Sequence, residues 1–126
     1  MTMAYPDDRK YTKDHEWIRL SGDTAEVGVT DYAQKQLGDV VYVELPEAGA
    51  QVMAGQPFGS IESVKAVSEL FAPATGEVVE ANSQLRDHPE AVNANPHATW
   101  MIKIRLANPS EANALLDSSQ YQALIG

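Results

Sequence analysis

The sequence predicts a mostly β fold with short peripheral helices, built from two related sheet halves. Short runs rich in β-branched residues alternate with turn residues along much of the chain. One 16-residue segment also recurs, which indicates that a strand path is used twice. Because 126 residues bury one modest core but not two, we expect a single domain over residues 1–126.

The first predicted element is a β-hairpin. Extended segments are expected at Trp17–Leu20 and Ala25–Val29, joined by the turn-forming tripeptide Ser-Gly-Asp. Thr30 is then expected to cap a short helix over residues 31–37. Gly38 follows this helix and is expected to take the left-handed conformation that ends many helices.

A strand predicted at residues 40–45 leads into the internal repeat. Residues 43–58 align with residues 70–85 at an offset of 27, and Gly55 falls on Asn82, another residue that tolerates positive φ. Because the shared prolines and glycines lie where turns are set, we expect the same backbone path twice. The identical pairs are Pro46 with Pro73, Gly49 with Gly76, Val52 with Val79, and Ala54 with Ala81.

The segment GSIESVKAVSE, residues 59–69, connects the two copies. Its apolar residues recur every three positions, as a helix could use, but they are β-branched, and proline and glycine confine the segment. We therefore predict a hairpin with its turn near Val64 and Lys65. The turn has no glycine or asparagine for a primed type, so a type I turn is expected.

The last third of the chain predicts smaller elements. One helical turn is expected within residues 87–96, started by Asp87, and a strand is expected at residues 100–106. Residues 110–125, which follow Pro109, predict two short helices or one bent helix, with Ser110 and Ser118 as candidate caps.

Composition argues against several classes of function. The net charge of −9 would repel phosphate backbones and anionic membrane surfaces, so neither nucleic acid nor a membrane is an expected partner. The chain has no cysteine, which excludes disulfides, zinc thiolate sites and a cysteine nucleophile. Its three histidines are scattered and its glycines stand singly, so we expect no metal site and no phosphate-binding loop.

The N-terminal sequence MTMAYPDDRKYTKDHEW has no apolar core and carries early acidic residues, which argues against a secretory signal or an intact transit peptide. No apolar stretch approaches the ~20 residues that span a bilayer. We therefore expect a bacterial-type cytoplasmic protein. A processed protein of the mitochondrial matrix is the less favoured alternative.

Lys65 is one of five lysines and stands between the small apolar residues Val64 and Ala66. On composition alone, a lysine at a hairpin tip is a solvated turn residue. A modifying ligase, however, needs an amine that projects from a rigid turn with neighbours too small to shield it. The position of Lys65 between the two repeat copies meets that requirement.

Several stretches resemble the glycine cleavage system H-protein family. They are YTKDHEW (11–17), VGVTDYAQKQLGDVVYVELP (ending at Pro46), ESVKAVSEL (62–70), APATGEVVEAN (72–82) and VN (92–93). The resemblance covers about residues 5–106. A lipoyl domain of a 2-oxo acid dehydrogenase would typically read DKA at the lysine, and a biotin carrier typically has flanking methionines, so both resemble this chain less.

The resemblance implies a lipoyl-domain-like barrel-sandwich hybrid of two quasi-symmetric sheets, with a C-terminal helical segment. It implies a carrier and not an enzyme, with (R)-lipoate in amide linkage to Lys65. The lipoyl arm would take an aminomethyl group from the glycine decarboxylase (P-protein) to the aminomethyltransferase (T-protein). Dihydrolipoamide dehydrogenase (L-protein) would then reoxidise the arm. A lipoate ligase or an octanoyl/lipoyl transferase would attach the arm, and a monomer is expected. The alternatives are a relay that donates lipoate to other lipoyl domains or serves another lipoate-dependent pathway, and an unmodified interaction domain.

The resemblance also implies roles for individual residues. Glu16, Glu69 and Asp14 are the candidates that line a cleft for the loaded arm, although Glu16 and Glu69 could equally be two surface carboxylates. Recognition by the lipoylating enzyme is implied for Gly59, Glu62, Ser63, Val64 and Ala66, with a β-bulge as the other interpretation of Gly59. Three departures from the family pattern are a glutamate where position 69 is often aspartate, Asp14 where relatives have a small polar residue, and HATW (97–100) where relatives usually have a glycine-containing turn.

Overall fold

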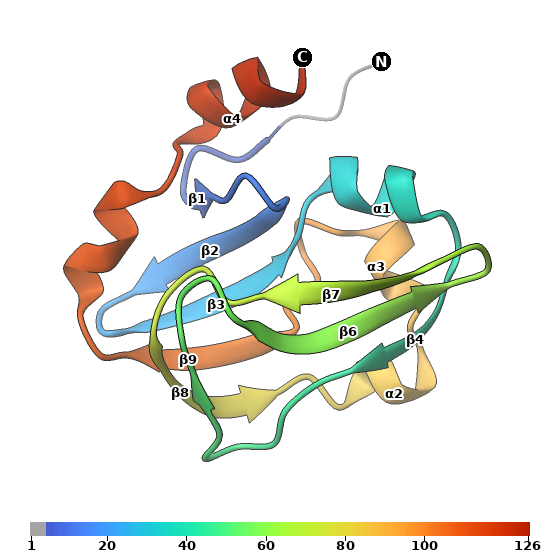
Figure 1. The fold of residues 1–126 in the computed structure, drawn as a ribbon, viewed down its shortest axis with the longest axis horizontal. Helices are drawn as coiled ribbons and strands as arrows, with labels where there is room; N and C mark the ends of the chain where they lie inside the picture. The colour runs from blue at the N-terminus through green and yellow to red at the C-terminus, as the bar shows by residue number, and fades with distance from the viewer. Residues whose placement is uncertain (1–4) are drawn as a thin grey trace.

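The computed structural model describes residues 5–126 and contains two antiparallel sheets (Figure 1). The six-stranded sheet has the order β1-β2-β3-β9-β8-β5, and the three-stranded sheet has the order β4-β6-β7. The mostly β, two-sheet class is therefore confirmed, although the two sheets are unequal in size. The first four residues, part of the segment on which the leader prediction rests, lie outside the described residues.

The strands are β1 (Lys10–Tyr11), β2 (Glu16–Ser21), β3 (Thr24–Val29), β4 (Val40–Glu44), β5 (Gln51–Val52), β6 (Pro57–Ser63), β7 (Val67–Phe71), β8 (Gly76–Ala81) and β9 (Ile102–Leu106). The helices are α1 (Asp31–Leu37), α2 (Gln84–Asp87), α3 (Ala91–Ala94), the 3₁₀ helix η1 (Pro109–Ala114) and α4 (Ser118–Ile125).

The first hairpin and the helix after it are confirmed. Strands β2 and β3 pair in register from Glu16 opposite Val29 to Ser21 opposite Thr24. The Thr30 hydroxyl accepts the Ala33 N–H at 3.2 Å and caps α1. Gly38 has φ +80° and ψ −159°, so it needs the freedom of glycine but does not take the left-handed helical conformation that we expected.

The repeat is confirmed as a path through the two sheets. Each copy leaves the three-stranded sheet, from β4 or β7, and enters the six-stranded sheet as β5 or β8, and these two strands pair with each other. The expected equivalence of the turn residues is wrong. Gly49 and Gly55 have positive φ, whereas their counterparts Gly76 and Asn82 do not. Gly76 is needed for another reason, because a Cβ there would collide with a backbone carbonyl of the adjacent β9.

The β6–β7 hairpin is also confirmed, and the helical interpretation of the segment is wrong. Ile61 pairs with Ser68 and Glu62 with Val67 across the hairpin. In Figure 1 the hairpin is the long loop that reaches past the other strands toward the connection between α1 and β4. Its turn therefore lies at the end of the three-stranded sheet.

A helical turn within residues 87–96 is confirmed as α3, but its predicted start at Asp87 is wrong. Asp87 is the last residue of α2, and the second helix, α3, begins at Ala91. The Asn82 side chain accepts the Gln84 N–H at 3.2 Å, which starts α2 upstream of the predicted position. His88 precedes a proline and has extended φ of −132°, so α2 ends before it.

Two short helices end the chain, as one of the two alternatives predicted, but their caps are not the predicted serines. Asn108 accepts the Ser110 N–H at 3.2 Å, and Asp117 accepts the Gln120 N–H at 2.8 Å. The Gln120 side chain accepts the Asp117 N–H in return, which completes a capping box. Ser118 is instead the first residue of α4, and its hydroxyl donates to the Tyr5 carbonyl at 2.7 Å.

Both sheets contribute to one apolar core. Ile18 and Ile104 come from the six-stranded sheet and Ile61 from the three-stranded sheet, and all three are at most 1% exposed. A second cluster of Tyr5, Tyr11, Trp17 and Tyr121 packs α4 against the N-terminal strands. Within residues 5–126, no helix is long and apolar enough to cross a membrane.

We predict that Gly59→Ala destabilises the fold. Gly59 lies at the bulge where β6 changes register against β7, and a Cβ there would collide with the Glu44 carbonyl of β4. Because this neighbour is backbone, we expect the free energy of unfolding in urea to fall by about 1–3 kcal/mol. Ser60→Ala is the control and should change it by less than about 0.5 kcal/mol. Equal stability of the two variants would contradict the steric account.

Candidate functional site

Ser63 closes the hairpin tip with its side chain. Its hydroxyl oxygen accepts the N–H of Ala66 at 3.1 Å and that of Lys65 at 3.3 Å, while its own N–H donates to the Ala66 carbonyl at 2.8 Å. In a type I turn closed by backbone, the Ala66 N–H would donate to the Ser63 carbonyl. The hydroxyl takes that place here, so Ser63 is a structural element of the tip.

The tip is attached to the connection between α1 and β4. The Val64 N–H donates to the Asp39 carbonyl at 3.0 Å. The Lys65 side chain passes so close to Gly38 that a Cβ at that glycine would lie 3.4 Å from the Lys65 Cε. The lysine itself is exposed, and its ammonium group forms no ion pair with any carboxylate of residues 5–126. A rigid turn thus presents an accessible amine.

A cavity of about 270 Å³ lies beside this hairpin. It is bounded by residues 66–70 of the hairpin, by residues 14–16 at the start of β2, and by α1. The three predicted cleft carboxylates, Asp14, Glu16 and Glu69, all line it. Residues from distant parts of the sequence therefore meet at one concave surface next to Lys65, as predicted for a cleft. Their role there stays a prediction.

The three carboxylates differ in environment. Glu16 is only 2% exposed, so the interpretation as a surface carboxylate is wrong for it, whereas Asp14 and Glu69 are exposed. Thr12 donates its hydroxyl to Glu16 Oε1 at 2.7 Å, and the Phe71 N–H donates to Oε2 at 3.3 Å. Burial raises the pKa of Glu16 to about 8, and these two hydrogen bonds oppose the rise only in part.

The predicted recognition residues occupy different environments. Gly59 lies at a β-bulge, which confirms that interpretation of the glycine. Glu62 is half-buried and pairs with Tyr42 on one side and Val67 on the other. Val64 and Ala66 flank Lys65 and are exposed, Val64 to 69%. A role in recognition stays a prediction for all of them.

A family model, "Glycine cleavage H-protein", matches residues 9–126. The chain belongs to this family. It is 54% identical to the glycine cleavage system H protein of Geobacillus kaustophilus over 98% of each chain. It is 56% identical to that of Koribacter versatilis over 95% of this chain and 93% of the relative. The crystal structure of the H protein of Mycobacterium marinum is 40% identical and superimposes with a TM-score of 0.89, covering 97% of this chain and 99% of that chain.

The HATW loop, which we expect to differ from the family pattern, is held against the rest of the protein by hydrogen bonds. The His97 carbonyl accepts from Arg9 Nη1 at 2.7 Å, and its ring Nε2 accepts the Asp31 N–H at 3.0 Å. The carbonyl of the preceding Pro96 accepts the indole N–H of Trp17 at 3.1 Å. The loop therefore packs against the N-terminal end of α1. The predicted effect on a partner contact stays a prediction.

Sequence reasoning missed His15, which lines the cavity between Asp14 and Glu16. Among residues 5–126 it is the one non-glycine residue with positive φ, at +72°. Its ring lies 4.6 Å from that of Tyr32, measured between centroids. The one sequence signal for His15 is its place in the segment YTKDHEW, between Asp14 and Glu16.

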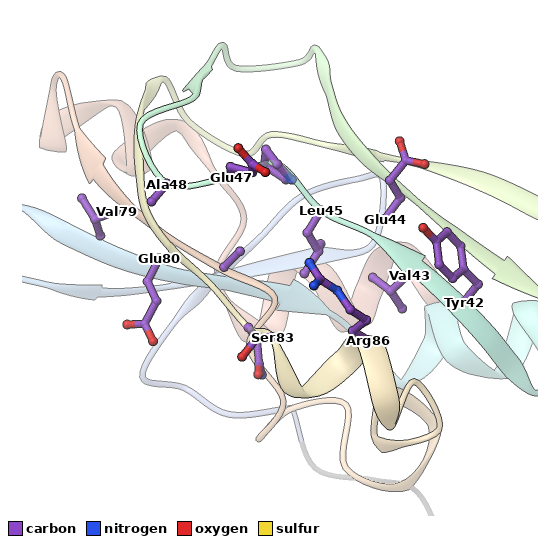
Figure 2. Close-up of a pocket in the computed structure, with 13 residues that line it drawn as sticks. Tyr42, Val43, Glu44, Leu45, Glu47, Ala48, Val79, Glu80, Ser83 and Arg86 are labelled. Carbon is purple, nitrogen blue, oxygen red and sulfur yellow. The ribbon is translucent and has the colours of Figure 1, made fainter.

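Other concave surfaces in the H-protein fold lack the predicted residues or share only one. A cavity of about 400 Å³ lies between β4 and β8. Figure 2 shows its lining residues, with Arg86 extending from α2 toward Leu45. A more apolar cavity of about 450 Å³ is lined in part by residues 11–14 and shares Asp14 with the cleft. Within residues 5–126, no three His, Asp or Glu side chains are grouped as a metal site requires.

We predict that Glu16 makes stability depend on pH. Its pKa in the folded protein is about 8, above the ordinary value of 4.5, so the folded state holds the proton more tightly than the unfolded state between these values. The free energy of unfolding should therefore fall as pH rises from about 4.5 to 8, with a slope of up to ~1.4 kcal/mol per pH unit. Urea unfolding of Glu16→Gln across this range should lack that slope.

Glu69→Gln is the matched control for this measurement. Glu69 lines the same cavity but is exposed, so its removal should leave the slope of the wild-type protein unchanged. If Glu16→Gln kept the wild-type slope, burial of the Glu16 carboxyl would not be its cause.

Proposed function

We propose that this chain is the lipoyl-bearing carrier of a glycine cleavage system, with (R)-lipoate attached to Lys65. The observation that carries the proposal is the placement of one exposed amine at the tip of an anchored hairpin, beside a cavity lined by carboxylates. Membership of the glycine cleavage H-protein family and the names of its relatives support it.

The residues around Lys65 fit a covalently attached arm. Val64 and Ala66 are small and do not cover the amine, so a ligase or an octanoyl/lipoyl transferase can reach it. Acylation removes the charge of Lys65, and no carboxylate of the described residues loses an ion pair. When attached, lipoate supplies a disulfide that accepts an aminomethyl group at the P-protein, delivers it at the T-protein and is reoxidised by the L-protein.

The protein scaffold contributes presentation and recognition. A tethered group reaches each partner at an effective concentration set by the arm, without a new binding event for a free cofactor. The hydrogen bonds of Ser63 and Val64 hold the tip in one geometry, so the same surface meets each partner. Cysteine is absent from the sequence, so no thiol of this chain can exchange with the dithiol of the arm.

The cleft would hold the cationic cargo while the carrier moves between partners. Asp14 and Glu69 provide exposed negative charge at its rim, and Glu16 provides a buried carboxyl group inside. Burial raises the pKa of Glu16 to about 8, so that group is mostly neutral at pH 7 when the cleft is empty. An ammonium group beside it favours the charged form and gains a charge-assisted hydrogen bond.

We predict that Lys65 is the attachment site. Incubation with lipoate, ATP and a lipoate ligase should raise the intact mass of the wild-type protein by one lipoyl group, and Lys65→Arg should stay unmodified. Lys35→Arg is the control, because Lys35 is an exposed lysine that pairs with Asp31 and should not affect modification. An unmodified wild type, or modification that persists in Lys65→Arg, ends the carrier proposal at this residue.

We further predict lipoate-dependent decarboxylation of glycine when the lipoylated chain is combined with P-, T- and L-proteins. Lys65→Arg should reduce the rate to the background without carrier, because no arm is attached. If the lipoylated chain gives only background activity, transfer of its lipoyl group to a separate lipoyl domain decides for the relay function instead.

A further inference from the structure

The C-terminal helix α4 inserts one side chain behind the cleft. Tyr121 is fully buried, and its ring stacks on that of Tyr11 at 4.9 Å with an interplanar angle of 13°. In Figure 1, α4 lies above β1, at the same end of the molecule as α1. The Tyr121 hydroxyl is thereby placed between the segment that precedes β2 and the residue that caps α1.

This hydroxyl joins two elements that form the cleft. It lies 2.8 Å from His15 Nδ1 and 2.8 Å from Thr30 Oγ1. Thr30 Oγ1 already accepts the Ala33 N–H, so its proton finds a partner only if it donates to Tyr121. Tyr121 then donates to His15 Nδ1, and a neutral His15 carries its proton on Nε2. Burial lowers the pKa of His15, which favours this neutral form.

His15 needs such support because its backbone is strained. A φ of +72° is costly for a residue with a side chain, and the surrounding contacts must maintain it. The His15 N–H donates to the Thr12 carbonyl at 3.1 Å, and the Thr30 N–H donates to the His15 carbonyl at 3.0 Å. The bond from Tyr121 is the one that holds the imidazole ring from the side of α4.

We propose that Tyr121 is a positioning residue for the loaded carrier. By holding His15, it keeps the wall of residues 14–16 in place, and with it the two carboxylates that flank His15 in the cleft. The inference rests on the proposed function, because its consequence concerns the cargo. In an aminomethyl thioether, water attacks the methylene carbon and the C–S and C–N bonds break, which yields thiol, formaldehyde and ammonium. A well-formed wall limits the access of water to that carbon.

Tyr121→Phe tests this in the full-length lipoylated chain, loaded by P-protein and glycine and then separated from the P-protein. Formaldehyde release from the variant should be about 3- to 10-fold faster than from the wild type, which corresponds to the loss of one hydrogen bond. His15→Phe keeps a ring beside Tyr32 but cannot accept the bond, so it should show a similar acceleration. The double variant should be no faster than either single variant, because the two residues act through one contact.

Tyr11→Phe is the matched control. It removes another hydroxyl of the same cluster, one that donates to the Pro6 carbonyl at 2.6 Å and forms no hydrogen bond with residues 14–16. Its formaldehyde release should equal that of the wild type, whatever its effect on thermal stability. Equal rates for Tyr121→Phe and Tyr11→Phe would overturn the inference.

A second readout separates failure of the inference from failure of the proposed function. Hydrogen exchange at the backbone amides of His15 and Glu16, measured on the unlipoylated chain, should be faster in Tyr121→Phe than in Tyr11→Phe. If the wild type cannot be loaded at all, the proposed function fails, and this measurement still decides whether Tyr121 holds the wall. Unchanged exchange in Tyr121→Phe would overturn the inference by itself.

Discussion

The candidate site depends on one buried carboxyl group that joins the two sheets. Glu16 begins β2 of the six-stranded sheet and accepts the N–H of Phe71, the last residue of β7 in the three-stranded sheet. A second hydrogen bond from Thr12 holds the loop before β2 around the same group. Removing a carboxyl group from water is costly, and burial raises its pKa to about 8 as a consequence. The protein thus keeps a proton-binding group where its two sheets and its cleft meet.

The hairpin tip resolves two opposing needs. A lysine proposed to carry a cofactor arm must be accessible to the enzymes that act on it, yet a freely moving loop would present no constant surface to them. Here residues 64–66 at the tip are exposed, while the preceding Ser63 is buried and accepts the backbone N–H groups of Lys65 and Ala66. The bond from Val64 to the Asp39 carbonyl attaches the tip to the connection after α1. Helix α1 therefore supports the tip and also forms one wall of the cleft.

The successes and errors of the sequence-based predictions have separable causes. The hairpins, the Thr30 cap and the strand at Ile102–Leu106 were predictable because they depend on neighbouring residues and on β propensity. The caps at Asn108 and Asp117 were missed because serine, asparagine and aspartate compete for the same position, and Ser118 found another acceptor in Tyr5. The aligned turn residues of the repeat differ in conformation because Gly76 is required by the close approach of the β9 backbone, and not by a positive φ in its own turn.

The sequence by itself determined the family and the connection between the repeat copies, and it supplied the residue that we propose is modified, because these depend on motifs and on contiguous residues. Only the tertiary structure decided that Asp14, Glu16 and Glu69 line one cavity, that Glu16 is buried, and that His15 stands between two of these carboxylates with its ring held from α4. These properties arise from contacts between residues as far apart as 106 positions. Burial and long-range hydrogen bonds form only when folding brings these distant residues together, so a local sequence pattern does not predict them.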